Sequence, residues 1–348
     1  MSGKGWQGNY FEDFTLGTGL DCPPDRTVTA GDAAAYIALT GDRTAAFCGA
    51  SQQAHPLVVF HTVFGQTVRP ISLNARANLG YAGIRWGAPV FFGDTLSTTL
   101  EVVGLKENSN RQTGVVYVHT VGRNQRGEEV LSYWRWVMVK KRGEAPTASL
   151  EAPVVPELPG SVAPSALRLD AKPLPARATG ARFFLEDYAA GERIDHYDGM
   201  TINPSDHMAF TRLFQNSAKV HFDAKLMEGK PLVYGGVVIS HAYAMALNGL
   251  EARLGIVGIN AGAHTSPIFA GDTLYAFTEV KEVFAPADSS VGALRLRLVG
   301  VKNVDPSSAD FALMVEDAKT PGKRVLNPAV VLDLDYWEAM PKRSGVEA

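Results

Sequence analysis

The chain has 348 residues, of which 46% are hydrophobic and 20% charged, and its formal net charge is −3. This length and apolar content suffice for two domains with cores of ordinary size, while the near balance of charge argues against a nucleic-acid binder, which would present a basic face. The two cysteines, Cys22 and Cys48, stand apart without a partner motif, which argues against a disulfide framework or a zinc site and favours a reducing compartment.

The first residues, Met-Ser-Gly-Lys-Gly-Trp, lack the apolar segment of a secretory signal. No run in the chain approaches the roughly 18 to 20 apolar residues of a membrane-spanning helix. We therefore expect a cytoplasmic protein without a membrane partner.

The first half of the chain predicts helices followed by strands. A short helix over about residues 30–39, with Asp32 as its N-cap, precedes a longer apolar helix over about 55–68. Alternating, β-rich segments then predict three strands, at residues 95–103, 114–121 and 130–139. In the last of these, Trp134 and Trp136 share one face, which suits a core or an interface.

A proline-rich segment separates the two halves. Residues 143–180 contain seven prolines, with Ala, Ser and Glu between them. Such a composition is extended and semi-rigid and has little capacity to form a core. We therefore predict an N-terminal domain over residues 1–142, a linker over 143–180 and a C-terminal domain over 181–348.

The second half predicts the same order of elements. A short helix over 204–214, with Ser205 as its N-cap, is followed by an apolar, small-residue helix over 233–254. Strands are expected at residues 273–283, 293–301 and 311–315. In each half, a long antiparallel sheet would wrap around one buried helix, and pairing two such units side by side would cover the exposed sheet edges.

The two halves also repeat in sequence. Residues 36–42 match 210–216 at an offset of 174, Pro56-Leu-Val matches Pro231-Leu-Val at 175, and residues 89–96 match 267–274 at 178. Nearly constant offsets in the same order indicate a duplicated domain. Five residues after Asn216 stands His221, whereas five residues after Asp42 stands Phe47. We therefore predict one live site, in the second half, and one site that has lost its function.

The plan and these residues resemble the MaoC-like hydratases, a family with the hot-dog fold whose motif is an Asp, four spacer residues and a His, followed by a glycine-containing helix start. Within that family, the resemblance is closest to the mesaconyl-CoA hydratases, also called β-methylmalyl-CoA dehydratases. Asn216 replaces the Asp of the wider motif, as it does in this branch. The segments that carry the resemblance are residues 74–81, 104–117, 135–139, 213–221, 234–240 and 269–273.

The resemblance implies an α+β double hot-dog fold with two tandem repeats, each an antiparallel sheet wrapped around a central helix. It implies a hydro-lyase that adds water to, or removes it from, a CoA thioester, most specifically between β-methylmalyl-CoA and mesaconyl-CoA. The expected partner is this acyl-CoA substrate, and the expected assembly is a homodimer. We expect no cofactor and no metal, since no ligand cluster and no dinucleotide fingerprint is present.

His221 is the predicted proton-transfer residue, because an imidazole can take a proton from water and deliver one to the α-carbon. The competing interpretation is a structural histidine. Asn216 cannot titrate, but its amide can orient water, or it can simply cap a turn. Gly235 and Gly236 open the second buried helix, whose free N–H groups would hold the thioester carbonyl; close packing is the alternative. The matching place in the first half is expected to be Val59-Phe60.

Several further residues are candidates for substrate binding. Lys219, Arg212, Arg76 and Arg85 lie near the motifs and could pair with a substrate carboxylate or with CoA phosphates; the alternative for each is a solvated surface residue. Asn78 and His264 are expected in matching loops that line the acyl pocket. Asp42 is expected to cap a helix or to bond Arg43, with a contribution to the live site as the alternative.

Three other functions stay open. A hydratase for a plain (R)-3-hydroxyacyl or an itaconyl-type CoA would use the same residues. A thioesterase on this fold would usually use a carboxylate, which the Asn216–His221 pair lacks. A non-catalytic acyl-CoA binding module would bind CoA esters without turnover.

Overall fold

The computed structural model describes residues 3–49, 51–147, 150 and 152–346. The helices are α1 (Ala30–Thr40), α2 (Ala45–Cys48), α3 (Pro56–Ser72), α4 (Ala176–Thr179), α5 (Pro204–Leu213) and α6 (Gly235–Met245), with short 3-10 turns that include η4 (Lys219–His221). The long strands are β3 (Ala75–Trp86), β4 (Thr95–Glu107), β5 (Thr113–Arg123), β6 (Glu129–Lys140), β7 (Arg193–Thr201), β8 (Gly255–Ala263), β9 (Thr273–Phe284), β10 (Val291–Lys302) and β13 (Val330–Pro341). The short strands are β1 (Gly19–Asp21), β2 (Arg26–Thr27), β11 (Met314–Glu316) and β12 (Arg324–Leu326).

One continuous antiparallel sheet runs through both halves of the molecule. Its order is β1-β4-β5-β6-β3-β8-β13-β10-β9-β7, and β2 also pairs with β4. The halves join where β3 pairs with β8, with Tyr81 opposite Gly262 and Arg85 opposite Gly258. The edge that each half would expose alone is therefore covered by the other half, as the double hot-dog prediction requires.

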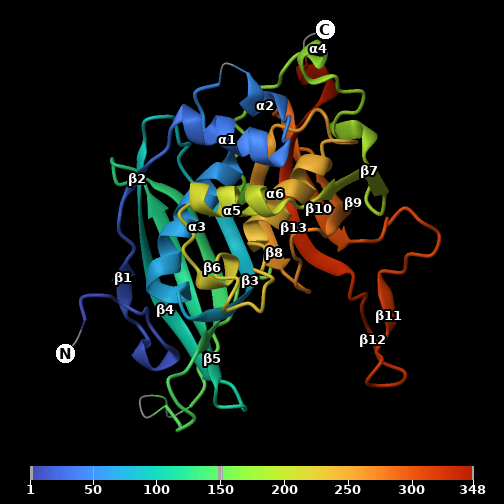
Figure 1. Cartoon of the computed structure of the whole chain (residues 1–348). Helices are drawn as coiled ribbons and strands as arrows, with labels where there is room; N and C mark the ends of the chain where they lie inside the picture. Colours follow the sequence, from blue (N-terminus) through green and yellow to red (C-terminus); the bar gives the residue numbers. More distant parts are fainter. Residues whose placement is uncertain (1–2, 50, 148–149, 151, 347–348) are drawn as a thin grey trace.

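The two central helices lie on the same face of this sheet, together with α1 and α5 (Figure 1). Helix α3 packs on β4 and β6, and α6 packs on β9 and β10. Both are buried along nearly their whole length, as expected for helices that are apolar on all sides. Side chains of both helices, among them Phe60, Phe64 and Val238, belong to one core cluster that spans the two halves.

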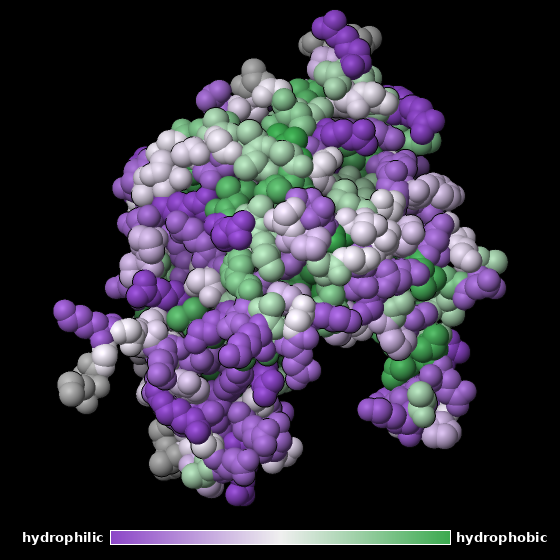
Figure 2. Space-filling model, viewed as in Figure 1, coloured by the Kyte–Doolittle hydropathy of each residue, from purple (hydrophilic) through white to green (hydrophobic). Residues whose placement is uncertain are grey.

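The strand prediction was wrong in two ways: one predicted strand is not part of the main sheet, and the long strands β3, β7, β8 and β13 were not predicted. The strand expected at 311–315 is only the start of the small hairpin β11–β12, which projects from the body (Figure 2), and β13 takes its place in the sheet. The strands β3 and β8 were missed because they are rich in Ala and Gly and lack alternation. Packing requires small residues there: a Cβ on Gly80 would lie 2.4 Å from the ring of Trp136.

Helix ends also differ from the prediction. Thr29, not Asp32, is the N-cap of α1, and Asp32 completes a capping box with it. Asn203, not Ser205, caps α5. Helix α6 ends at Met245 and is followed by turns, so it is shorter than predicted.

The linker lies along the outer face of the sheet. Of residues 143–180, 148–149 and 151 lie outside the described residues; Val154 forms a bridge with Leu105, and the Val162 N–H donates to Asn260 Oδ1 at 2.7 Å. Trp134 lies on this outer, half-buried face and stacks on His119 instead of entering the core. Within the described residues, no helix is both long and apolar enough to cross a membrane.

Candidate active site

A cavity of about 310 Å³ lies between the two halves. Its first-half wall comes from α3, β3 and β6, and its second-half wall comes from η4, the start of α6 and the segment after β8. The residues used below are Phe64, Ser72, Asn78, Tyr81, Arg135, Asn216, His221, Tyr234, Gly235 and His264. The duplication therefore builds one site from both of its copies.

His221 is a buried histidine at the end of η4, on the second-half wall. Its Nδ1 lies 2.8 Å from the carbonyl oxygen of Leu232. A carbonyl can only accept, so Nδ1 carries the proton and Nε2 is left as the basic nitrogen. Burial lowers the pKa of His221 to about 4, although the hydrogen bond to Leu232 opposes this shift. At neutral pH, the imidazole is therefore neutral and able to take a proton.

Asn216 holds the turn that leads to His221. Its Oδ1 accepts from the Ala218 backbone N–H at 3.1 Å, and the residue is buried on the cavity wall. The turn-capping and the site interpretations are therefore both consistent with its position. One lone pair of this oxygen is used by the turn, and the amide Nδ2 is the side-chain group that can donate to a ligand or water.

The start of α6 faces the cavity. Tyr234 occupies the N-cap position without a side-chain cap, and the first backbone N–H groups of a helix have no partner inside it. Gly235 lines the cavity, whereas Gly236 does not. Close packing also requires the glycines: a Cβ on Gly235 would lie 2.3 Å from His264 Nε2, and one on Gly236 would lie 2.4 Å from the Tyr234 ring.

Asn78 and His264 both line the cavity, but only His264 lies outside a strand, directly after β8. Asn78 belongs to β3, so its assignment to a loop was wrong. Both polar side-chain atoms of Asn78 are buried and lack a partner among the described residues. His264 Nε2 lies 3.2 Å from the Tyr81 hydroxyl, and burial lowers the pKa of His264 to about 4.

Lys219 and Arg212 are not brought to this wall. Both side chains are exposed, and neither lines the cavity. Two arginines do line it: Arg76 of β3, which is exposed, and Arg135, which lies on the inward face of β6 and is fully buried. Sequence reasoning missed Arg135 because Trp134 and Trp136 were assigned to a core or an interface, whereas the alternation of β6 places Tyr133, Arg135 and Val137 on the buried face.

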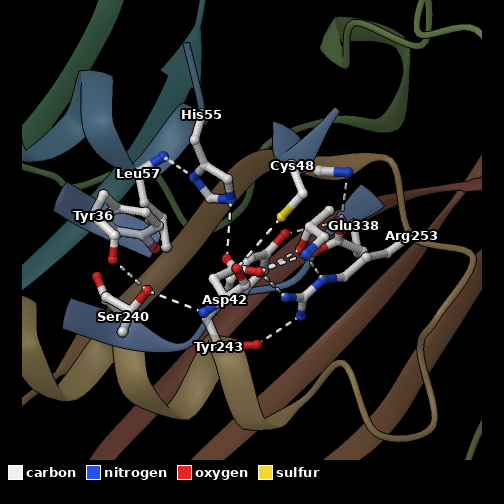
Figure 3. A network of polar contacts seen from close by, with 12 residues as sticks. Tyr36, Asp42, Cys48, His55, Leu57, Ser240, Tyr243, Arg253 and Glu338 are labelled. Carbon is white, nitrogen blue, oxygen red and sulfur yellow. Dashed lines mark hydrogen bonds and ion pairs between the residues drawn. The ribbon is translucent and has the colours of Figure 1, made fainter. Parts of the chain in front are cut away.

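The corresponding place in the first half is filled by the protein itself (Figure 3). Asp42 accepts from the Thr44 backbone N–H at 2.9 Å, forms an ion pair with Arg253 at 3.1 Å and lies 3.2 Å from His55 Nε2. Burial opposes its ionisation, but the Arg253 charge and the bonds from His55 and Thr44 hold the pKa of Asp42 well below its usual range. Its partners are therefore not Arg43, and it does not line the 310 Å³ cavity.

The first-half helix start is closed. The backbone contacts Ala54–Val90 and Val233–Ile268 are equivalent, so Pro56-Leu57, not Val59-Phe60, stand where the second half has Gly235-Gly236. Proline has no N–H, and the Leu57 N–H donates to His55 Nδ1 at 3.0 Å. A cavity of about 470 Å³ lies beside Phe47 and Pro56. It therefore lacks the free N–H groups of the helix start and the histidine that the 310 Å³ cavity has.

Two curated relatives match nearly the whole chain, whereas no family model matches it. A mesaconyl-CoA hydratase from Cereibacter sphaeroides is 49% identical over 349 residues, which cover 96% of this chain and 98% of that protein. A β-methylmalyl-CoA dehydratase from Chloroflexus aurantiacus is 45% identical over 361 residues, which cover 99% of this chain and 100% of that protein.

Solved structures agree with these relatives. A MaoC domain protein dehydratase from Chloroflexus aurantiacus superposes with a TM-score of 0.89 at 45% identity, covering 98% of this chain and 100% of that one. A Mycobacterium tuberculosis protein described as a double hotdog fold gives a TM-score of 0.71 at 25% identity, covering 96% and 98%. The predicted fold and family are confirmed: the chain belongs to the MaoC-like family of mesaconyl-CoA hydratases and β-methylmalyl-CoA dehydratases, which are hydro-lyases of CoA thioesters.

Proposed function

We propose that this protein interconverts mesaconyl-CoA and β-methylmalyl-CoA by adding or removing water, with the 310 Å³ cavity as its active site. The observation that carries the proposal is the neutral His221, with Nε2 as its basic nitrogen, on the same wall as Asn216 and the uncapped start of α6. The names of the two relatives describe the two directions of this one reaction.

The proposed chemistry needs a base, a proton donor and a site for negative charge. His221 Nε2 takes a proton from water while the water oxygen bonds to the β-carbon of the enoyl thioester. The electron pair of the double bond moves onto the thioester, and the N–H groups at Gly235 stabilise the resulting enolate oxygen. The protonated His221 then delivers its proton to the α-carbon. Dehydration runs through the same steps in reverse.

Asn216 is proposed to orient the attacking water through its amide Nδ2, while its Oδ1 accepts from Ala218. The reaction moves only protons and water, so we propose that it needs no metal or redox cofactor. We also propose a cytoplasmic location and a homodimer, the latter testable by the mass of the protein in solution.

A thioesterase is the main alternative chemistry. It would activate water with a carboxylate, and among the described residues that line the cavity none is Asp or Glu. The discriminating experiment offers mesaconyl-CoA, crotonyl-CoA and an itaconyl-type CoA and follows enoyl-thioester absorbance and free thiol in parallel. We expect loss of the enoyl signal without thiol release, fastest for mesaconyl-CoA. Thiol release, or binding without turnover, would overturn the proposal.

A further inference from the structure

Arg135 is a buried cation for which the described part of the chain supplies no counter-ion. The residue is 0% exposed on β6, and its Nη2 donates to Ser72 Oγ at 3.1 Å. Its Nε and Nη1 are buried and lack a partner among the described residues. The guanidinium lies 4.5 Å from the ring centroid of Phe64. An arginine stays charged in proteins, so at least two of its donors are left without an acceptor from residues that the structure describes.

The other fully buried arginine shows what such a group ordinarily requires. Arg253 is paired with Asp42 and also donates to Thr44 Oγ1 and to the Tyr243 carbonyl. Around Arg135, the titratable neighbours are Tyr133, Tyr81, Tyr234 and Cys22, and none is a carboxylate. Because an unpaired buried charge is strongly unfavourable, Arg135 is prepared for an anion that comes from outside the chain.

A second unsatisfied group stands beside it. In the pairing of β3 with β6, Tyr81 is opposite Arg135 and Asn78 is opposite Val137, two residues further along β6. Arg135 and Val137 share one strand face, and side chains opposite each other across strands lie on the same face. Asn78 therefore lies diagonally next to Arg135 on the cavity wall, with both of its polar atoms unpartnered.

We infer that Arg135 selects the substrate by pairing with its free carboxylate, with Asn78 as a second donor. This inference rests on the proposed function, because mesaconate is a dicarboxylic acid and its thioester keeps one free carboxylate. That carboxylate is attached to the β-carbon that water attacks. The first-half wall therefore recognises the acid group, while the second-half wall carries the chemistry. Pairing with Arg135 also removes the repulsion that the negative group would exert on an incoming oxygen nucleophile.

The test compares mesaconyl-CoA with crotonyl-CoA, which lacks the carboxylate, in the wild type, Arg135→Met and Arg135→Lys. In Arg135→Met, we expect kcat/KM for mesaconyl-CoA to fall by about 10²- to 10³-fold, while kcat/KM for crotonyl-CoA stays unchanged or rises. Arg135→Lys should retain part of the preference, because it keeps the charge but loses the planar fork. Arg85→Met, an exposed arginine of β3 outside the cavity wall, is the matched control and should alter neither substrate.

An equal loss for both substrates in a folded Arg135→Met protein would overturn the inference and leave the proposed reaction standing. If the wild type hydrates crotonyl-CoA as well as mesaconyl-CoA, it is the proposed substrate that fails. Inhibition of the wild type by unreactive succinyl-CoA and butyryl-CoA does not depend on whether a variant folds. Succinyl-CoA should inhibit at least about 10²-fold more tightly, and equal inhibition would overturn the inference.

Discussion

The two central helices begin in opposite ways, although they occupy equivalent places in the duplicated fold. Helix α3 begins with Pro56 and Leu57, where one N–H is missing and the next is bonded by His55. Helix α6 begins with Gly235 and Gly236 under no side-chain cap. The same contrast holds for charge, because Asp42 and Arg253 neutralise each other whereas Arg135 has no counter-ion in the described residues. The difference teaches that the open helix start of one half and the unpaired arginine of the other half meet at a single cavity, which both halves build.

Removing His221 should cause the largest loss of turnover, because only the second half has a histidine at this position of the repeat. In His221→Ala, we expect kcat for mesaconyl-CoA hydration to fall by about 10²- to 10⁴-fold, because the general base is lost. Circular dichroism should show a folded protein, and binding of succinyl-CoA should persist. Turnover close to that of the wild type in this folded variant would refute the assignment of the live site to the second half.

Obstructing the N–H groups at the start of α6 should make this helix start resemble that of α3. Gly235→Ala places a methyl group 2.3 Å from His264 Nε2, so the ring or the helix must shift away from the bound carbonyl. We expect kcat to fall by about 10²- to 10³-fold, the loss typical of a removed oxyanion donor. Gly143→Ala, where a Cβ would meet nothing within 4 Å, is the control. Equal kcat in the two variants would show that α6 does not serve the reaction.

Breaking the charge pair of the first half should affect stability and not chemistry. Asp42→Asn leaves Arg253 buried without its carboxylate, so the free energy of unfolding should fall by about 3–5 kcal/mol. The kcat of the protein that stays folded should remain near that of the wild type, since Asp42 does not line the live cavity. Denaturant unfolding and assays below the melting transition measure both. A loss of kcat comparable to that of His221→Ala would mean that Asp42 serves the second-half site.

The pH dependence should report the burial of His221. With its pKa lowered to about 4, the base stays deprotonated at neutral pH, so kcat/KM should be flat from about pH 8 down to about 5.5 and should decline only near the lowered value. An inflection near 6.5 would indicate a solvated imidazole instead.

The lowered pKa of His221 also means that the folded state binds fewer protons than the unfolded state. The stability from this group is therefore complete above 6.5 and is lost as pH falls through about 4.

Local pattern and repetition sufficed for the parts of this site that lie close together in sequence. The common position of Asn216, His221 and Gly235 on one wall could be predicted, because they fall within one short stretch and because the first half supplies a contrast, whereas Gly236 does not line the cavity. The alignment of the two central helices could not be predicted, because the segment between the motif and the helix is longer in the second half. The sequence match of Pro56-Leu-Val with Pro231-Leu-Val was a coincidence.

Arg135 could not be predicted because its meaning depends on strand pairing. It lies on β6, and its neighbours Asn78 and Tyr81 come from β3, a strand whose small residues give no alternating pattern. Lys219 and Arg212 looked better placed because they stand beside the motif in sequence, yet both side chains point to solvent. Separation along the chain is therefore a poor guide to a wall that two copies build together.

The most direct test of the comparison is the number of ligand sites in each chain. Succinyl-CoA, which keeps the thioester and the carboxylate but has no double bond to hydrate, can be titrated calorimetrically into the wild type and into His221→Ala. We expect one site per chain in both proteins, because the 470 Å³ cavity beside Phe47 and Pro56 lacks the open helix start and the unpaired arginine. Two sites of similar affinity per chain would contradict it.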